Sequence, residues 1–184
     1  MAHSGERIVN PITGERIVFV RPAQETDGEC LLMDVELRPG GVIAGAPHRH
    51  PFTESFHVTQ GRLAGWIAGE GTFSYTAGER FSIPPETDHL VFNAAPGLSR
   101  AQVEARPGGD FDLLLETAFD LSAGKRPRGL PRLRGVSELA RLMRDQKVMV
   151  AFVPDSVQQA VMSLIARPQD RRGARPAASR QPAA

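Results

Sequence analysis

The chain has 184 residues, a length that suits one domain with an additional segment. Its 22 basic and 21 acidic side chains nearly cancel, which excludes a strong overall attraction to nucleic acid or to membrane surfaces. The single cysteine, Cys30, excludes an internal disulfide, and no apolar run is long enough for a signal peptide or a membrane span. We therefore expect a soluble, cytoplasmic protein with neither nucleic acid nor membrane as a partner.

Residues 7 to about 118 predict strands separated by turns. Short runs rich in Val, Ile, Phe and Leu alternate with Gly, Pro, Asn and Asp, and no helical period comes between them. This pattern favours an all-β sandwich or a small barrel. The expected strands are RIVNP, RIVFVRP, CLLMDVELRPGG, ESFHVTQG, RLAGWIAGEG, TFSYTAG, RFSIPP, HLVFNA, LSRAQVEARPGG and FDLLLETAF.

The composition changes near residue 120, which divides the chain into four parts. Residues 1–120 are predicted to form the barrel, including its N-terminal strands. Residues 121–135 are basic and rich in Pro and Gly, so they predict a connector. Residues 136–167 predict two short amphipathic helices, and residues 168–184 are expected to be disordered.

The two predicted helices carry apolar residues at helical spacing, and we expect them to pack on the outside of the barrel or against a second subunit. Asp155 or Ser156 is a candidate cap for the second helix. The apolar positions are Leu139, Leu142 and Met143 in the first helix, and Val157, Val161, Met162, Leu164 and Ile165 in the second.

Three of the five histidines lie in APHRHPFTESFHVTQG, residues 46–61. Side chains at i, i+2 and i+4 of a strand point to one face, so His48, His50 and Glu54 are expected together, beside Phe56. Imidazole nitrogens and carboxylate oxygens are good ligands for zinc, iron, manganese and nickel ions. This segment by itself leaves open a pair of surface histidines on an edge strand.

A second segment, AGERFSIPPETDHLVFN at residues 77–93, supplies a further imidazole. Gly78 turns the chain, Pro84 and Pro85 form a rigid corner, and His89 opens the next strand. His89 reaches the same inner face as the first pair if the two strands lie across a barrel from one another.

These two segments resemble the two sequence motifs of the cupin superfamily, in the form found in single-domain bacterial cupins. The resemblance covers residues 42–93 by motif and extends to about residue 118 by strand pattern. It implies a double-stranded β-helix, the jelly-roll cupin barrel, here with a small C-terminal helical extension. The matching residues are His48, His50, Glu54 and Gly61 in the first motif, and Gly78, Pro84, His89 and Asn93 in the second.

The sequence departs from the family pattern at two positions. Val42 and Glu86 stand where the family usually has glycine. If residue 86 needs a positive φ, glutamate costs about 1 kcal/mol there relative to glycine. That substitution bears on the height of His89 in the barrel.

The resemblance implies that His48, His50, Glu54 and His89 hold one divalent metal ion, which could be Fe, Mn, Ni or Zn. Glu54 would serve as a ligand or, if it leaves the metal, as a catalytic base. His57 is expected on the other face of its strand. The candidate residues for an apolar substrate pocket are Met33, Phe56, Trp66, Phe81 and Phe92, although each is also a plausible core residue.

Three functions remain open from the sequence. The first is a metal-dependent enzyme, dioxygenase-like, acting on a small and fairly apolar or aromatic molecule. The second is an isomerase, cyclase or decarboxylase of secondary metabolism, and the third is a non-catalytic sensing cupin. We also expect a homodimer, because RIVNPITGERIVFV could cross to a partner and so protect an exposed sheet edge.

Overall fold

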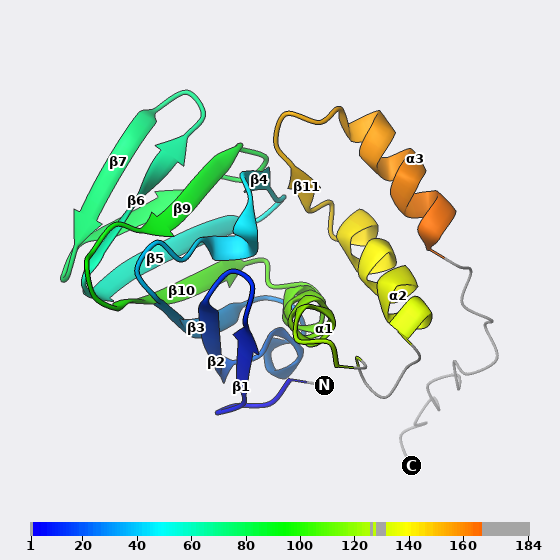
Figure 1. Ribbon diagram of the computed structural model, residues 1–184, viewed down its shortest axis with the longest axis horizontal. Coiled ribbons are helices and arrows are strands. Elements are labelled where there is room, and N and C mark those ends of the chain that lie inside the picture. The colour runs from blue at the N-terminus through cyan, green and yellow to red at the C-terminus, as the bar shows by residue number, and fades with distance from the viewer. Residues whose placement is uncertain (1, 126, 128–131, 167–184) are drawn as a thin grey trace, which may run out of the picture.

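The computed structural model describes residues 2–125, 127 and 132–166. Two antiparallel sheets face one another and form a jelly-roll barrel, as the sequence predicts (Figure 1). The six-stranded sheet has the order β1-β2-β3-β10-β5-β8, and the five-stranded sheet has the order β11-β4-β9-β6-β7. The predicted disordered tail, residues 168–184, lies outside the described residues.

The first sheet consists of β1 (Arg7–Asn10), β2 (Glu15–Arg21), β3 (Leu31–Leu37), β5 (Thr53–Gln60), β8 (Arg80–Ile83) and β10 (Ser99–Arg106). The second consists of β4 (His48–Arg49), β6 (Arg62–Ile67), β7 (Gly71–Thr76), β9 (His89–Asn93) and β11 (Met149–Val150). The helices are α1 (Phe111–Ser122), α2 (Arg132–Asp145) and α3 (Asp155–Ile165), with short 3-10 turns η1 (Ala23–Thr26) and η2 (Ile43–Gly45).

The strands form where apolar and polar residues alternate, because one face of each sheet turns into the barrel. In β3, for example, Leu31, Met33, Val35 and Leu37 are buried and the residues between them are not. The N-terminal hairpin of β1 and β2 extends the chain's own six-stranded sheet by pairing with β3. Cys30 is buried, as expected for a small apolar side chain.

The prediction of a strand at FDLLLETAF is wrong, because these residues begin helix α1. Phe111, Leu114, Leu115 and Phe119 are all buried in the main core. Their spacing of three and four residues places them on one side of a helix. A short apolar run fits both a buried strand and a buried helix, and here packing against the barrel selects the helix.

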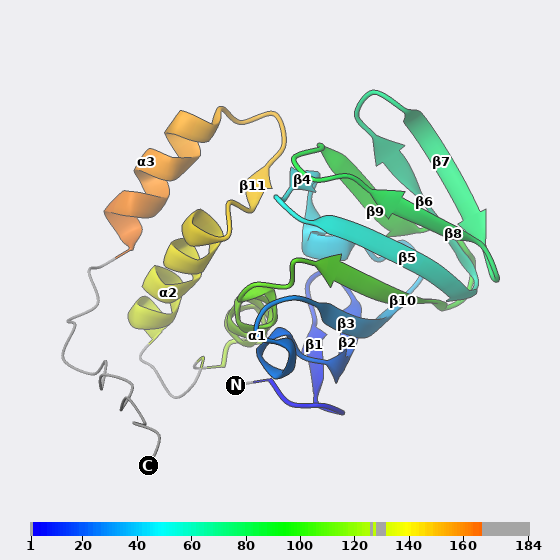
Figure 2. The same ribbon diagram turned by 180° about the vertical axis from the view of Figure 1, so that it is seen from behind.

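The C-terminal extension lies beside β4, on the side of the barrel away from β7 (Figures 1 and 2). Between α2 and α3 the chain forms β11, a strand that the sequence pattern did not predict, and β11 pairs with β4. In α2, Leu142 is fully buried in the main core, as the helical spacing predicts. None of the described helices is long and apolar enough to cross a membrane.

The expected apolar side of α3 is mostly exposed. Of its five predicted apolar residues only Met162 is buried, in a small cluster with Met149 and Ala140. Val157 is 52% exposed and Leu164 is 86% exposed. Helix α3 therefore contacts α2 and β11 through a narrower side than its sequence suggests, because the side chain of Gln158 takes one of the buried positions.

Candidate metal centre

His48 and His89 come together through strand pairing. β4 and β9 are antiparallel neighbours in the five-stranded sheet, and His48 lies opposite His89. His50 follows β4 directly, and Glu54 lies in β5 of the opposite sheet. All four side chains are buried, with exposed fractions of 6%, 1%, 0% and 3% for His48, His50, His89 and Glu54.

The three histidines form one cluster between the sheets, and the Glu54 carboxylate lies against two of them. One ring nitrogen from each histidine lies within 4.8 Å of the corresponding atoms of the other two. The Glu54 Oε2 atom is 3.4 Å from the His50 Nε2 atom and 3.8 Å from the His89 Nε2 atom. The structure thus groups His48, His50 and His89 as a possible metal site and places Glu54 beside His50 and His89.

Backbone carbonyl groups orient each of the three imidazole rings. The Nδ1 atoms of His48, His50 and His89 lie 3.0, 2.9 and 2.9 Å from the carbonyl oxygens of residues 46, 52 and 87. A carbonyl only accepts hydrogen bonds, so each neutral ring carries its proton on Nδ1. The Nε2 atoms are then unprotonated, and those of His50 and His89 face Glu54 with lone pairs available for a cation.

No hydrogen bond satisfies the centre of this cluster. His50 Nε2, His89 Nε2 and Glu54 Oε2 are buried and have no hydrogen-bond partner. Buried polar atoms without a partner are costly, and three acceptors facing one another repel as well. A divalent cation would satisfy all of them, so this donor set fits a metal ion.

Burial also favours the protonation states that metal binding requires. It lowers the pKa of His48 to about 4 and lowers the pKa of His89 as well. Burial alone would raise the pKa of Glu54, but the neighbouring imidazoles of His50, His89 and His48 lower it. At neutral pH His48 and His89 are therefore neutral and Glu54 is ionised.

An aromatic wall that the sequence reading missed flanks the cluster. The Phe52 ring stacks on the His50 ring with centroids 3.9 Å apart and planes within 2°. Phe111 of α1 lies 4.7 Å from Phe52. Phe52 could have been predicted beside His50 from the sequence, because it lies two residues later and so on the same side of an extended chain. The position of Phe111 could not, because it depends on α1 being a helix.

Three of the five predicted pocket residues lie inside the barrel. Met33, Phe56 and Phe81 are buried, and the Phe56 and Phe81 rings stack 4.5 Å apart. The prediction for Trp66 and Phe92 is wrong, because both lie on the outer face of the five-stranded sheet.

Strand parity explains that correction. In β9, His89, Val91 and Asn93 face inward, so Phe92 faces outward. Trp66 lies opposite Leu90 in the β6–β9 pairing and points to the same outer side, where it lies near Phe152.

The remaining motif residues build the scaffold. Gly61 has a φ of 76°, and a Cβ there would lie 2.4 Å from the Ser99 Oγ atom. The Asn93 side chain donates to the carbonyl groups of Leu37 and Gly97, which ties the strand ends together. These roles are structural.

Glu86 lies in a turn that requires a positive φ. This residue adopts a φ of 56°, and its N–H group donates to the His50 carbonyl oxygen at 2.7 Å. Val42, at the other departure, has an ordinary extended φ of −121°. The corner before His89 therefore forms with glutamate at residue 86, and His89 reaches the cluster.

Both histidine motifs lie within a segment that matches a known protein family. Residues 33–100 match the family described as "Cupin domain". No curated protein sequence matches the chain.

Three solved structures illustrate the structural similarity. KdgF from Halomonas sp. is 23% identical with a TM-score of 0.46, over 54% of this chain and 85% of that one. The polyketide cyclase RemF from Streptomyces resistomycificus is 20% identical with a TM-score of 0.45, over 50% of this chain and 65% of that one. An RmlC-like cupin from Shewanella frigidimarina is 20% identical with a TM-score of 0.46, over 54% and 82%.

Likeness at this level does not carry a substrate or a reaction from those proteins to this one. The domain match covers both histidine motifs, and the strands it spans form the barrel that holds them. Residues 33–100 therefore match the cupin domain family, and they lie within a jelly-roll barrel.

Proposed function

We propose that this protein is a mononuclear metal-dependent enzyme that acts on a small, fairly apolar or aromatic molecule. The observation that supports this most is the set of buried acceptor atoms of His50, His89 and Glu54, which face one another without any donor. A site that only stabilised the fold would be better served by apolar side chains or by a paired donor.

The four residues would divide the work between binding and chemistry. His48, His50 and His89 would be neutral ligands, and Glu54 would supply one negative charge, so a divalent ion would keep net positive charge. Four protein ligands leave one or two positions on a metal that takes five or six, where it can polarise a bound oxygen atom or, if redox-active, activate dioxygen. Fe, Mn, Ni and Zn all accept this donor set.

Glu54 is the proposed catalytic residue. Its buried carboxylate is ionised at neutral pH because its pKa is lowered. If it releases the metal it can accept a proton from a substrate carbon or hydroxyl group within the barrel.

The surroundings favour an apolar substrate. Phe52 stacks on His50, and Phe111 packs against Phe52. Among the described residues, no buried side chain is a lysine or an arginine, so no buried cation is available to pair with a phosphate. An aromatic or dicarbonyl compound suits such a wall better than a phosphorylated sugar.

We place dioxygenase-like chemistry first, because the cupin resemblance through these four ligands points to it. Isomerase, cyclase or decarboxylase chemistry needs the same site without oxygen consumption. A sensing protein would bind metal and ligand without turnover.

One set of measurements separates these functions. Protein purified without chelators should contain about one divalent metal per chain. The Fe(II) form is then tested for oxygen uptake with catechols, flavonols and 1,3-diketones, and for product formation without oxygen. Uptake supports a dioxygenase, whereas product formation without uptake supports the isomerase group.

His50→Ala is the matched test of the site. We expect it to weaken metal binding at least a hundredfold while the barrel stays folded, because it removes one of four ligands. His57→Ala is the control, since His57 lies on the outer face of β5. Equal metal content in the two variants would defeat the assignment.

A further inference from the structure

The strand that carries His48 is weakly held by its own barrel sheet. β4 has only two residues, and its pairing with β9 consists of the single pair His48 and His89. A metal site requires its ligand atoms to be held within about 0.5 Å of their working positions. Contacts beyond this pairing must therefore position β4.

The C-terminal extension supplies a second strand partner. β11, about a hundred residues later in the chain, pairs with β4 so that Val150 lies opposite His48 and Met149 opposite Arg49. The Ala151 N–H group continues the pairing by donating to the Pro47 carbonyl oxygen at 2.9 Å. β4 thus lies between β9 and β11.

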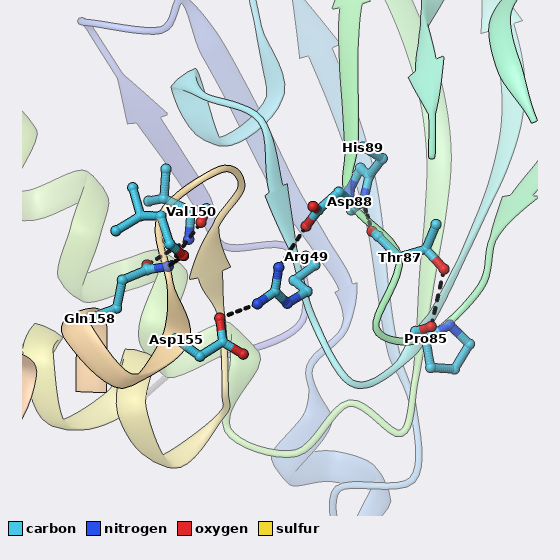
Figure 3. Close-up of polar contacts among 9 residues, drawn as sticks. Arg49, Pro85, Thr87, Asp88, His89, Val150, Asp155 and Gln158 are labelled. Atoms are coloured by element: carbon cyan, nitrogen blue, oxygen red, sulfur yellow. Dashed lines mark hydrogen bonds and ion pairs between the residues drawn. The ribbon is translucent and has the colours of Figure 1, made fainter. Parts of the chain in front are cut away.

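Gln158 of α3 completes the outer edge of β11. Its Oε1 atom accepts a hydrogen bond from the Val150 N–H group at 2.8 Å, and its Nε2 atom donates to the Val150 carbonyl oxygen at 2.9 Å (Figure 3). The Gln158 amide therefore satisfies both the N–H and the C=O group of Val150, as the backbone of a further strand would. This fixes β11 to α3, and Gln158 is itself buried.

The guanidinium group of Arg49 connects β4 both to the start of β9 and to α3. Arg49 lies between His48 and His50 in the chain, and its Nη1 atom donates to Asp88, directly before His89, at 2.8 Å. Its Nη2 atom donates to Asp155, the first residue of α3 (Figure 3). The Arg49 and Asp88 side chains are 19% and 25% exposed, so solvent screens this ion pair less than it would at the surface, whereas Asp155 is more exposed.

We propose that Arg49 is a positioning residue for the metal centre, and that α3 holds β4 in its metal-binding geometry through Asp155. The planar fork of arginine suits this role because it engages two carboxylates in fixed directions. The C-terminal extension then helps to position the metal ligands. A substitution that weakens its contact with β4 should change metal affinity although all four ligands remain. This inference rests on the proposed function.

Asp155→Asn is the direct test, because it removes the negative charge that holds one arm of the bridge and leaves all four ligands. Asp145→Asn is its control: Asp145 pairs with Arg141, and its side chain is 41% exposed against 45% for Asp155. Co(II) is the probe, with affinity measured by chelator competition and geometry by the visible absorption spectrum. We expect about tenfold weaker binding and an altered spectrum for Asp155→Asn, and the wild-type values for Asp145→Asn.

Arg49→Lys gives a second test, since lysine keeps the charge but cannot fork. It should weaken Co(II) binding at least as much as Asp155→Asn. Adding Asp155→Asn to Arg49→Lys should then have little further effect, because the two changes break one connection.

The outcomes separate the two proposals. If the variants lower only the melting temperature, and bind Co(II) with wild-type affinity and spectrum, the positioning role is wrong and the metal site stands. If wild-type protein binds no Co(II), the proposed function fails and the positioning role fails with it.

Discussion

His48 and His89 are direct partners across β4 and β9, with ring centroids 4.4 Å apart. Strands β5 to β8 come between them in the chain, so only the folded barrel brings the two rings together. The His89 Nε2 atom also lies 3.8 Å from the Glu54 Oε2 atom of the opposite sheet. The candidate metal centre is therefore a junction between the two sheets, and its chemistry depends on their packing.

Replacing Glu54 by glutamine should have opposite effects on apo stability and on metal binding. The amide can donate to the unpartnered Nε2 atom of His50 or His89, which lie 3.4 and 3.8 Å from the present Oε2 atom. We expect the free energy of unfolding of the metal-free protein to rise by about 1 kcal/mol, measured by urea titration. Metal affinity should fall because a charged ligand is lost.

Glu70→Gln serves as the control, because Glu70 is exposed in the turn between β6 and β7. It should change neither quantity. A metal-free Glu54→Gln protein less stable than wild type would contradict the account of facing acceptors.

The metal-free protein should lose stability on acidification through His48. The folded-state pKa of His48 is about 4, against an ordinary value of 6.5, so the unfolded chain takes up a proton first as the pH falls. The contribution is complete above pH 6.5 and is lost as the pH falls toward 4. It amounts to about 3 kcal/mol across that window.

Glu15, whose pKa is raised from 4.5 to about 8, acts in the opposite direction over much of this window, so urea unfolding is measured between pH 7 and 4 in a Glu15→Gln background. A His48→Asn variant should show a flatter dependence, since asparagine does not titrate. Bound metal should also be released in this range, because the imidazoles must be neutral to ligate. Retention of metal at pH 4 would argue against histidine ligation.

Glu15 should produce the opposite dependence on the alkaline side. Burial raises its pKa from 4.5 to about 8, and its carboxyl group accepts only a 3.4 Å hydrogen bond from the Ala44 N–H group. The folded chain therefore keeps a proton that the unfolded chain loses above pH 4.5. Stability is complete below that pH and falls as the pH rises through 8, by up to about 5 kcal/mol.

Glu15→Gln should remove this loss, because the amide is neutral at every pH and can still accept from Ala44. The measurement is the free energy of unfolding between pH 5 and 9 in both proteins. An unchanged alkaline slope in the variant would show that Glu15 is already ionised in the folded state.

Glu86→Gly should stabilise the protein by about 1 kcal/mol. Glu86 has a φ of 56°, a conformation that costs a residue with a Cβ atom but not glycine. The hydrogen bond from the residue 86 N–H group to His50 survives the change. Glu86→Ala is the control, since alanine keeps the Cβ atom, and thermal unfolding should show a gain for glycine alone.

Sequence patterns were enough to predict most of the barrel strands and the four candidate ligands, but not helix α1 or strand β11. Alternation of apolar and polar residues is a local property, so it can be read without coordinates, and it correctly placed His48, His50 and Glu54 on the inner faces. The cupin motifs then supplied His89. The alternation of side chains along a strand also predicts that Phe92 faces outward, because Val91 and Asn93 on either side of it face inward.

Helix α1, strand β11 and the ion pairs of Arg49 could be seen only in the folded protein, because they depend on contacts between distant segments. The run at FDLLLETAF fits either a strand or a helix, and packing of Phe111 beside Phe52 resolves it. β11 is two residues long and exists because β4 offers it an edge. In the sequence Arg49 looks like an ordinary surface residue, but in the fold it donates to both Asp88 and Asp155. No local sequence pattern can predict a partner that lies a hundred residues away.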